Sequence, residues 1–277
     1  MRLGVTIFQT DQVMGPAEVA REAEARGFHS FFVPEHTHIP TSRRTPAPTG
    51  EPELPEEYKR TLDPFVALAA AASVTSRIRL GTGIALVAQR DPIVMAKEVA
   101  TLDLLSHGRA VLGVGFGWNR EEAEDHGVDF PRRRAQGREH VLAMEALWAN
   151  ERAGFAGEFV RFEESWSWPK PVQQPRPPVL LGGVAGPTLF RHIAEYGDGW
   201  IPVGGAGVAE ALPALRRAME AVGRDPAALQ VVVFGTFPKP GKLEHYAALG
   251  VTEVVLRLPS GPAAAVRPVL DDYARLL

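Results

Sequence analysis

Short apolar runs and helical patterns alternate along the whole chain of 277 residues. The runs are rich in β-branched and aromatic residues, as buried strands are. Strict alternation over this length favours a closed (β/α)8 barrel over an open doubly wound sheet, and such barrels commonly take about 250 residues. We therefore expect an α/β protein in which residues 1–277 form a single (β/α)8 TIM barrel domain. The eight predicted strands are residues 3–8, 29–33, 78–87, 109–114, 178–181, 199–203, 230–235 and 251–256.

Local signals mark where several of the helices begin. Asp63-Pro64 and Asp91-Pro92 each combine an N-capping acid with a proline at the first helical position. They predict helices over residues 65–75 and 93–105. The other predicted helices cover residues 16–26, 120–126, 131–148, 187–196, 208–222, 242–249 and 262–276.

Composition limits the classes of protein to which the chain can belong. Its net charge is −3, and 45% of its residues are hydrophobic, which is typical of a globular protein without a basic surface for nucleic acid. It has no cysteine, so disulfides and thiolate chemistry are excluded. The longest apolar run, residues 65–74, is too short to span a bilayer, and the first residues have no signal-peptide pattern. We expect a cytoplasmic protein that binds neither membrane nor nucleic acid.

Two long segments depart from the alternation. Residues 37–60 are dense in Pro, Gly, Arg and Glu and follow the second predicted strand. A loop of this length is often a lid, and here we expect it to close over a pocket. Residues 150–178 carry several aromatics and prolines and are expected to form an irregular insertion that packs over the barrel.

The carboxyl ends of barrel strands meet on one face, where such folds place their chemistry. Five of the eight predicted ends carry glycine, which favours a close approach of backbone to a flat or phosphorylated ligand. The alternative is that these glycines only turn the chain. Residues 182–186, Gly-Gly-Val-Ala-Gly, lie directly before a predicted helix. Free amide groups at such a helix start form a phosphate site.

Glu35 and His36 follow the second predicted strand and are the first candidates for catalysis. Histidine exchanges a proton near neutral pH, which suits acid–base work. His36 and His38 also form an H-x-H pair that suits a metal ion, but the fifth, sixth and eighth strand ends offer no further His or Asp. We therefore expect no metal, and interpret His38 as the start of the lid.

Two further patterns are informative. The glycines at 113, 115 and 117 are not a dinucleotide fingerprint, because the third comes one residue too early. Residues 132–134 are three consecutive arginines. They are interpreted as a solvated helix start, with contact to an anionic cofactor tail as the alternative.

Several of these segments, in this order and spacing, resemble the luciferase-like monooxygenase family, in particular its branch that uses the deazaflavin coenzyme F420. The resemblance extends over nearly the whole chain, and the family fold is a (β/α)8 barrel. The segments that carry it are Gly27-Phe28, Pro34-Glu35-His36, Leu62-Asp63-Pro64, residues 79–84, residues 108–117, residues 177–183 and residues 197–200.

The resemblance implies roles for these residues. His36 would lie beside the flavin ring and transfer a proton or stabilise charge, with Glu35 flanking the cofactor. Gly83-Ile84 would form a non-prolyl cis peptide that supports the ring, and the lid and the aromatic insertion would close the pocket and select the substrate. The implied cofactor-binding residues are Gly83, Ile84, Gly115, Gly117, Trp118, Asn119, Gly182, Gly183, Val184, Ala185, Gly186 and Gly204.

The implied function is F420-dependent hydride transfer to or from a small organic substrate. One alternative is an FMNH2-dependent two-component monooxygenase that is supplied by a separate flavin reductase. A further alternative is a non-catalytic flavin-binding protein. Family analogy also implies a homodimer. Trp118 stands where members that oxidise sugar phosphates have an acidic residue, and the chain is shorter than the light-emitting members. These departures argue against a sugar-phosphate substrate and against bioluminescence.

Overall fold

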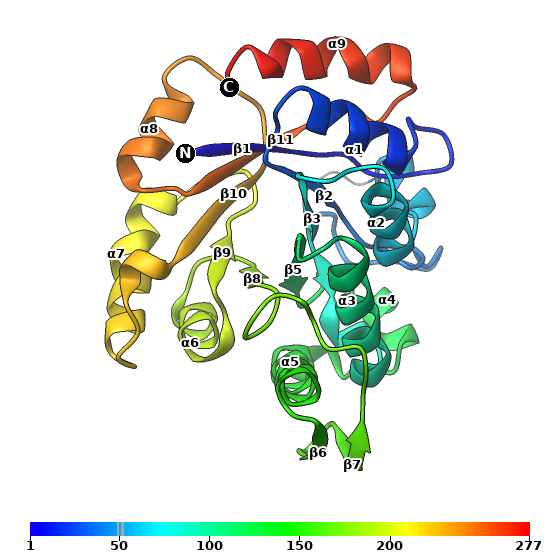
Figure 1. Ribbon diagram of the computed structural model, residues 1–277, viewed down its shortest axis with the longest axis vertical. Coiled ribbons are helices and arrows are strands. Elements are labelled where there is room, and N and C mark those ends of the chain that lie inside the picture. The colour runs from blue at the N-terminus through cyan, green and yellow to red at the C-terminus, as the bar shows by residue number, and fades with distance from the viewer. Residues whose placement is uncertain (49, 51–52) are drawn as a thin grey trace.

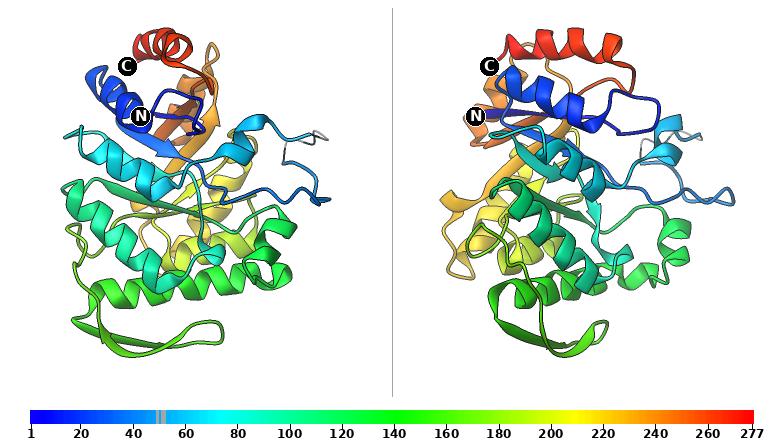
Figure 2. Two further views of the ribbon diagram at one scale, coloured as in Figure 1. Left: turned by 90° about the vertical axis from the view of Figure 1, so that its right-hand side faces the viewer. Right: turned by 45° about the vertical axis from the view of Figure 1, so that its right-hand side comes forward.

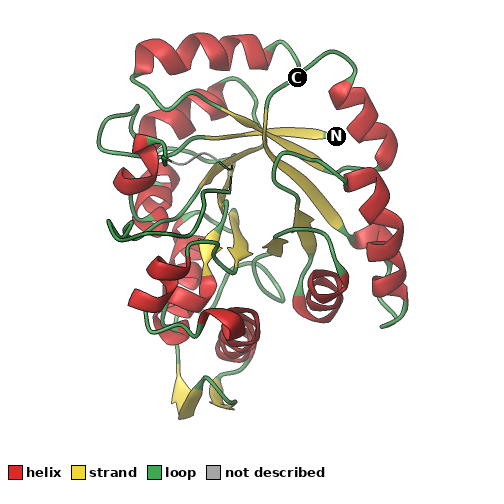
Figure 3. Cartoon of the chain, turned by 180° about the vertical axis from the view of Figure 1, so that it is seen from behind, coloured by secondary structure: helices red, strands yellow, loops and turns green. Residues whose placement is uncertain are grey.

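The structure is a computed structural model that describes residues 1–48, 50 and 53–277. Its centre is a closed barrel of parallel strands (Figures 1 and 3), and the sheet closes because β3 (Arg79–Thr82), at one end of the strand order, pairs with β5 (Ala110–Gly115) near the other end. The predicted (β/α)8 barrel is therefore confirmed. The barrel strands are β1 (Arg2–Thr6), β2 (Ser30–Val33), β3 (Arg79–Thr82), β5 (Ala110–Gly115), β8 (Val179–Gly182), β9 (Gly199–Ile201), β10 (Gln230–Thr236) and β11 (Glu253–Arg257).

Helices surround this barrel, as Figure 3 shows. The two Asp-Pro starts are confirmed, because Asp63 accepts a hydrogen bond from the Val66 N–H and Asp91 accepts from Ile93 and Val94. A short helix also follows β5. The α-helices are α1 (Pro16–Ala25), α2 (Pro64–Ala72), α3 (Pro92–Leu105), α4 (Arg120–Asp125), α5 (Arg133–Ala149), α6 (Pro187–Tyr196), α7 (Val208–Glu220), α8 (Lys242–Leu249) and α9 (Ala263–Ala274).

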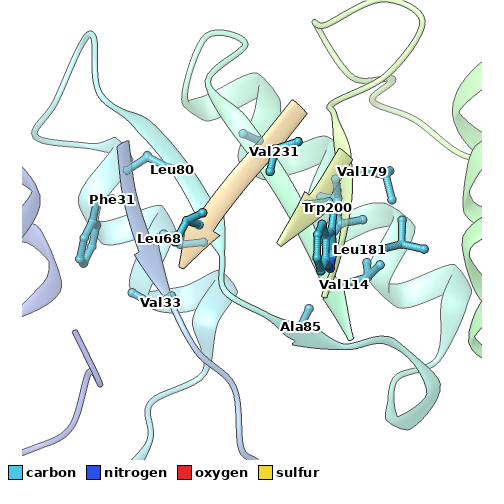
Figure 4. Packing of buried hydrophobic residues seen from close by; sticks show 14 of the residues in the cluster. Phe31, Val33, Leu68, Leu80, Ala85, Val114, Val179, Leu181, Trp200 and Val231 are labelled. Carbon is cyan, nitrogen blue, oxygen red and sulfur yellow. The ribbon is translucent and has the colours of Figure 1, made fainter. Parts of the chain in front are cut away.

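Alternate residues of each strand divide the core into two layers. Inside the barrel lie Phe32, Leu180, Val232 and their neighbours. Between the strands and the helices lies a larger cluster, part of which is drawn in Figure 4, with Val114, Leu181 and Trp200 on adjacent strands. Because side chains of a strand point alternately to opposite faces, two buried faces give the continuous apolar runs seen in the sequence.

The third predicted strand, residues 78–87, is wrong as a single element. It is divided into β3 and the short β4 (Ala85–Leu86), which pairs with the end of β5. Between them lies the cis peptide bond Gly83-Ile84, as the family resemblance implies.

The insertion at residues 150–178 also differs from expectation. It contains an antiparallel hairpin, β6 (Arg152–Ala156) and β7 (Arg161–Trp166). The hairpin follows the outer side of α5, where Glu139 accepts hydrogen bonds from the backbone at its tip (Figure 2). It does not lie over the strand ends, so the prediction that it closes the pocket is wrong.

Within the described part of the chain, each helix is too short or too polar to traverse a lipid bilayer.

Candidate functional site

A buried histidine–carboxylate pair lies at the carboxyl ends of the strands. His36 is three residues beyond β2, and its Nδ1 lies 2.8 Å from Oε2 of Glu122 on α4. The other oxygen of Glu122 accepts a hydrogen bond from the Thr37 N–H at 3.3 Å. His36 is 8% exposed and Glu122 only 1%, so the pair is held away from water. The carboxylate fixes the direction of the ring and leaves Nε2 on its opposite side.

Aromatic rings surround His36. Tyr58, on the 3-10 helix η1 (Glu56–Arg60), has its ring centroid 5.3 Å from that of His36, and Trp118 lies at 5.7 Å. Phe8, beyond β1, extends this group at 4.8 Å from Tyr58. No signal in the sequence pointed to Tyr58 as a site residue. Together the rings form an apolar wall that can exclude water from the imidazole.

Glu35 faces a different environment from its neighbour. Its Oε1 accepts a hydrogen bond from Arg90 Nε at 2.6 Å, and its Oε2 accepts from the Leu86 N–H at 2.7 Å. Arg90 also pairs with Asp63 and Glu98. Burial raises the pKa of Glu35, and the Arg90 cation opposes that shift. Both oxygens have protein partners, so this geometry argues against the predicted catalytic role and indicates a structural one.

The H-x-H pair does not converge on one point. His36 turns to Glu122, whereas His38 Nε2 lies 3.0 Å from Oδ2 of Asp125 and the His38 side chain is partly exposed. Thr37 Oγ1 connects His38 with His126, at 2.9 and 2.7 Å. Among the described residues, no three or more His, Asp or Glu side chains are grouped closely enough to hold a metal ion.

Several glycines at the strand ends make room for the protein's own side chains. A Cβ on Gly115 would lie 1.4 Å from Cδ1 of Ile84, and one on Gly182 would lie 3.1 Å from its Cγ2. A Cβ on Gly83 would likewise meet the Phe234 ring at 2.3 Å. Ile84 is packed onto the inner layer of the barrel and remains partly exposed. At these positions the expected close approach of a ligand is replaced by internal packing that supports Ile84.

Other glycines do face open space. A Cβ on Gly186 or Gly204 would meet nothing within 4 Å, and Val184 beside Gly186 is 86% exposed. Residues 183–186 lead directly into α6, whose first turn has no side-chain cap. Uncapped N–H groups at a helix start suit a phosphate. Among the predicted cofactor-binding residues, this loop and Gly204 have room for a ligand.

Unpartnered polar groups gather near the same strand ends. The side-chain amides of Gln9, Gln89 and Asn119 have buried nitrogen and oxygen atoms with no hydrogen-bond partner among the described residues. Gln9 follows β1, Gln89 follows β4 and Asn119 follows β5. Buried amides normally have partners, so these three fit the polar edge of a bound heterocycle. The residues present therefore fit a flat cofactor with a phosphate.

The described part of the predicted lid projects outward at this end of the barrel (Figure 2). Glu121 of α4 accepts hydrogen bonds from Thr45 Oγ1 at 2.6 Å and from the Arg44 N–H at 2.9 Å. These bonds lower the pKa of Glu121 to about 2, the one from Thr45 having the largest effect. At the other end of the loop, Glu57 pairs with Arg257 of β11 at 2.6 Å. Residues 49, 51 and 52 of the predicted lid lie outside the described residues.

Comparison with known proteins bears on this arrangement. The family model for luciferase-like monooxygenases matches residues 9–238. An uncharacterized protein of Mycobacterium tuberculosis is 49% identical over 280 residues, which is 100% of this chain and 99% of that protein. An F420-dependent glucose-6-phosphate dehydrogenase of Kineococcus radiotolerans is 33% identical over 216 residues, which is 75% of this chain and 59% of the enzyme.

Solved structures share the fold at lower identity. An F420-dependent secondary alcohol dehydrogenase in complex with an F420-acetone adduct has a TM-score of 0.78 at 18% identity, covering 100% of this chain and 98% of that one. A monooxygenase of Streptomyces bottropensis, RslO1, has a TM-score of 0.79 at 22% identity, with the same coverage of 100% and 98%.

Proposed function

Because the chain belongs to the luciferase-like monooxygenase family, we propose that it is a coenzyme F420-dependent oxidoreductase that transfers hydride to or from a small organic substrate. The observation that carries the proposal is the buried pair of His36 and Glu122 beside an aromatic wall. The 33% identity with an F420-dependent dehydrogenase favours the deazaflavin over other cofactors.

When bound, the deazaflavin supplies the ring carbon that accepts or gives hydride. The chain orients cofactor and substrate, excludes water from the site and transfers the proton. Ile84 offers an apolar floor for the ring, and Gln9, Gln89 and Asn119 offer partners for its polar edge. The loop of residues 183–186 offers amide groups for the phosphate.

His36 is the proposed acid–base residue. Glu122 engages Nδ1, so Nε2 is the nitrogen available to a substrate. Nε2 takes the proton when a substrate hydroxyl is oxidised and returns it when a carbonyl is reduced. Glu122 is a positioning residue that acts through His36, and it stabilises the protonated ring.

The second candidate is an FMNH2-dependent monooxygenase, since the same apolar floor and phosphate loop suit FMN. Fluorescence-quenching titrations with F420 and with FMN separate the two. The proposal predicts tight, saturable binding of F420 and weaker binding of FMN. Tighter binding of FMN than of F420 would favour the monooxygenase. If no substrate were converted with either cofactor in activity assays, a non-catalytic flavin-binding protein would be favoured.

We also propose that two copies of the chain associate through α2 and α3. Large apolar side chains on these adjacent helices are exposed, among them Val66 at 71% and Val94 at 56%. Several exposed apolar side chains on neighbouring helices are typical of an interface. A second copy would cover them with an identical surface.

A further inference from the structure

A basic pocket opens outside the barrel mouth, between the starts of α5 and α6. Its volume is about 440 Å³. Four arginines line it, together with a single carboxylate, Glu195, and with Thr188 of the first turn of α6. The four are Arg132, Arg134, Arg138 and Arg191.

Two of these arginines already have acidic partners. Arg132 pairs with Glu158 of the hairpin at 2.5 Å, and Arg138 Nε pairs with Glu195 at 2.8 Å. Arg191 is exposed and has no ion pair with a described carboxylate. The pocket therefore holds an excess of positive charge that the protein does not neutralise.

Arg134 packs against an aromatic ring and has no ion pair with a described carboxylate. Its guanidinium lies over the ring of Phe116, with Cζ 4.9 Å from the ring centroid. Its Nη1 is buried and has no acceptor among the described residues. A guanidinium that is held in place without an acceptor suits an incoming carboxylate or phosphate.

One of the lining arginines, Arg134, reaches the glycine loop of the proposed cofactor site. Nη2 of Arg134 lies 3.9 Å from the position that a Cβ on Gly183 would occupy. The positive end of α6 adds to the field on the same side. His192, which also lines the pocket, has its pKa lowered to about 4 by burial and then by nearby arginines, Arg191 first among them. The lining arginines and the start of α6 together make the surroundings cationic.

We infer that this pocket binds an oligocarboxylate chain, the oligo-γ-glutamate tail that F420 carries beyond its phosphate. The inference rests on the proposed function and goes beyond it, because it assigns Arg134 and Arg191 to a part of the cofactor that is remote from the ring. FMN ends at its phosphate and has no group to place there. The pocket thereby favours the deazaflavin cofactor.

The test compares F420 with FO, the deazaflavin that lacks phosphate and tail, by fluorescence titration at low salt. The proteins are the wild type, Arg134→Gln, Arg191→Gln and the control Arg217→Gln, an exposed arginine on α7. In both pocket variants, the Kd for F420 should rise about tenfold or more, and the Kd for FO should stay unchanged. The control should alter neither.

Equal weakening of FO and F420, or unchanged F420 binding, would overturn the inference while leaving the proposed function standing. If the wild type bound neither deazaflavin, the proposed function would fail. The pocket would then be tested by NMR titration with tetra-γ-glutamate as the only ligand. A saturable NMR shift of the His192 ring at millimolar peptide, absent from Arg134→Gln, would still support the site. No shift in the wild type would reject it.

Discussion

Nδ1 of His36 and Oε2 of Glu122 lie 2.8 Å apart, although the two residues are 86 positions apart in the chain. The pair joins the loop after β2 to α4, and both side chains are buried. A ring held in this way leaves one defined nitrogen, Nε2, without the carboxylate. The proposed chemistry depends on that orientation.

Replacing Glu122 with Gln keeps the size of the side chain but removes the charge that holds the ring. We expect kcat to fall roughly 10- to 1,000-fold, with the Kd for F420 changed little, because proton transfer contributes about 10² to 10⁴ in rate. Steady-state kinetics with any substrate of the wild type measures this. The matched control is Glu124→Gln, an exposed residue of the same helix, which should keep full activity. Unchanged kcat in Glu122→Gln would remove the assigned role.

Gly115→Ala tests the support beneath the proposed ring site. The added methyl would lie 1.4 Å from Ile84 Cδ1, so Ile84 must move. Overpacking of this kind costs about 1–3 kcal/mol of unfolding free energy, and cofactor binding should weaken as well. Urea denaturation and F420 titration measure the two effects. Gly15→Ala is the control, since its Cβ meets nothing within 4 Å. Equal stability of the two variants would contradict the packing described here.

Glu121→Gln should loosen the lid. The carboxylate accepts two hydrogen bonds from residues 44 and 45, and a neutral amide accepts them more weakly. Faster amide hydrogen exchange in this segment is the expected result, and Glu124→Gln should show none. The folded pKa of about 2 lies below the ordinary value of 4.5, so this contribution is fully present above pH 4.5. It is lost as the pH falls through about 2.

His192 should make stability depend on pH. Its pKa falls from 6.5 to about 4 on folding, so between these values the unfolded chain binds more protons. Stability is complete above pH 6.5 and declines by roughly 1–3 kcal/mol as the pH falls to 4. Urea denaturation across this range should show a smaller decline for His192→Gln than for His245→Gln, an exposed histidine on α8. Identical profiles would show that His192 titrates normally.

Val94→Glu tests the proposed dimer. A charge in the exposed apolar surface of α3 should prevent association, because burying it without a partner is unfavourable. Light scattering should then give the mass of one chain, while the wild type gives twice that mass. Glu210→Gln, on α7, is the control. A monomeric wild type would contradict the proposal.

Local chemistry explains why much of the fold was predictable. Asp63 and Asp91 cap helices through contacts within their own first turns, and the apolar runs report strands buried on both faces. The hairpin was missed because its strands are largely exposed and lack an apolar alternation. Such strands carry little pattern for a sequence to reveal.

The candidate site was less accessible from sequence. His36 was predicted, but its partner Glu122 was not, since only folding brings α4 to the loop after β2. The available signal was the position of Glu122, an acidic residue about one helical turn beyond Trp118. The partner of Glu35 was hidden for a similar reason, because Arg90 is 55 residues away in the chain. The cis bond at Gly83-Ile84 was implied by family resemblance, not by local residue preferences.

A crystal structure of the protein soaked with F420 tests the central claim most directly. We expect the deazaflavin ring to pack against Ile84 and the phosphate to lie at residues 183–186. Nε2 of His36 should face the ring or the substrate space beside it. A cofactor bound elsewhere, or His36 turned away from the ring with Glu122 unpaired, would contradict it.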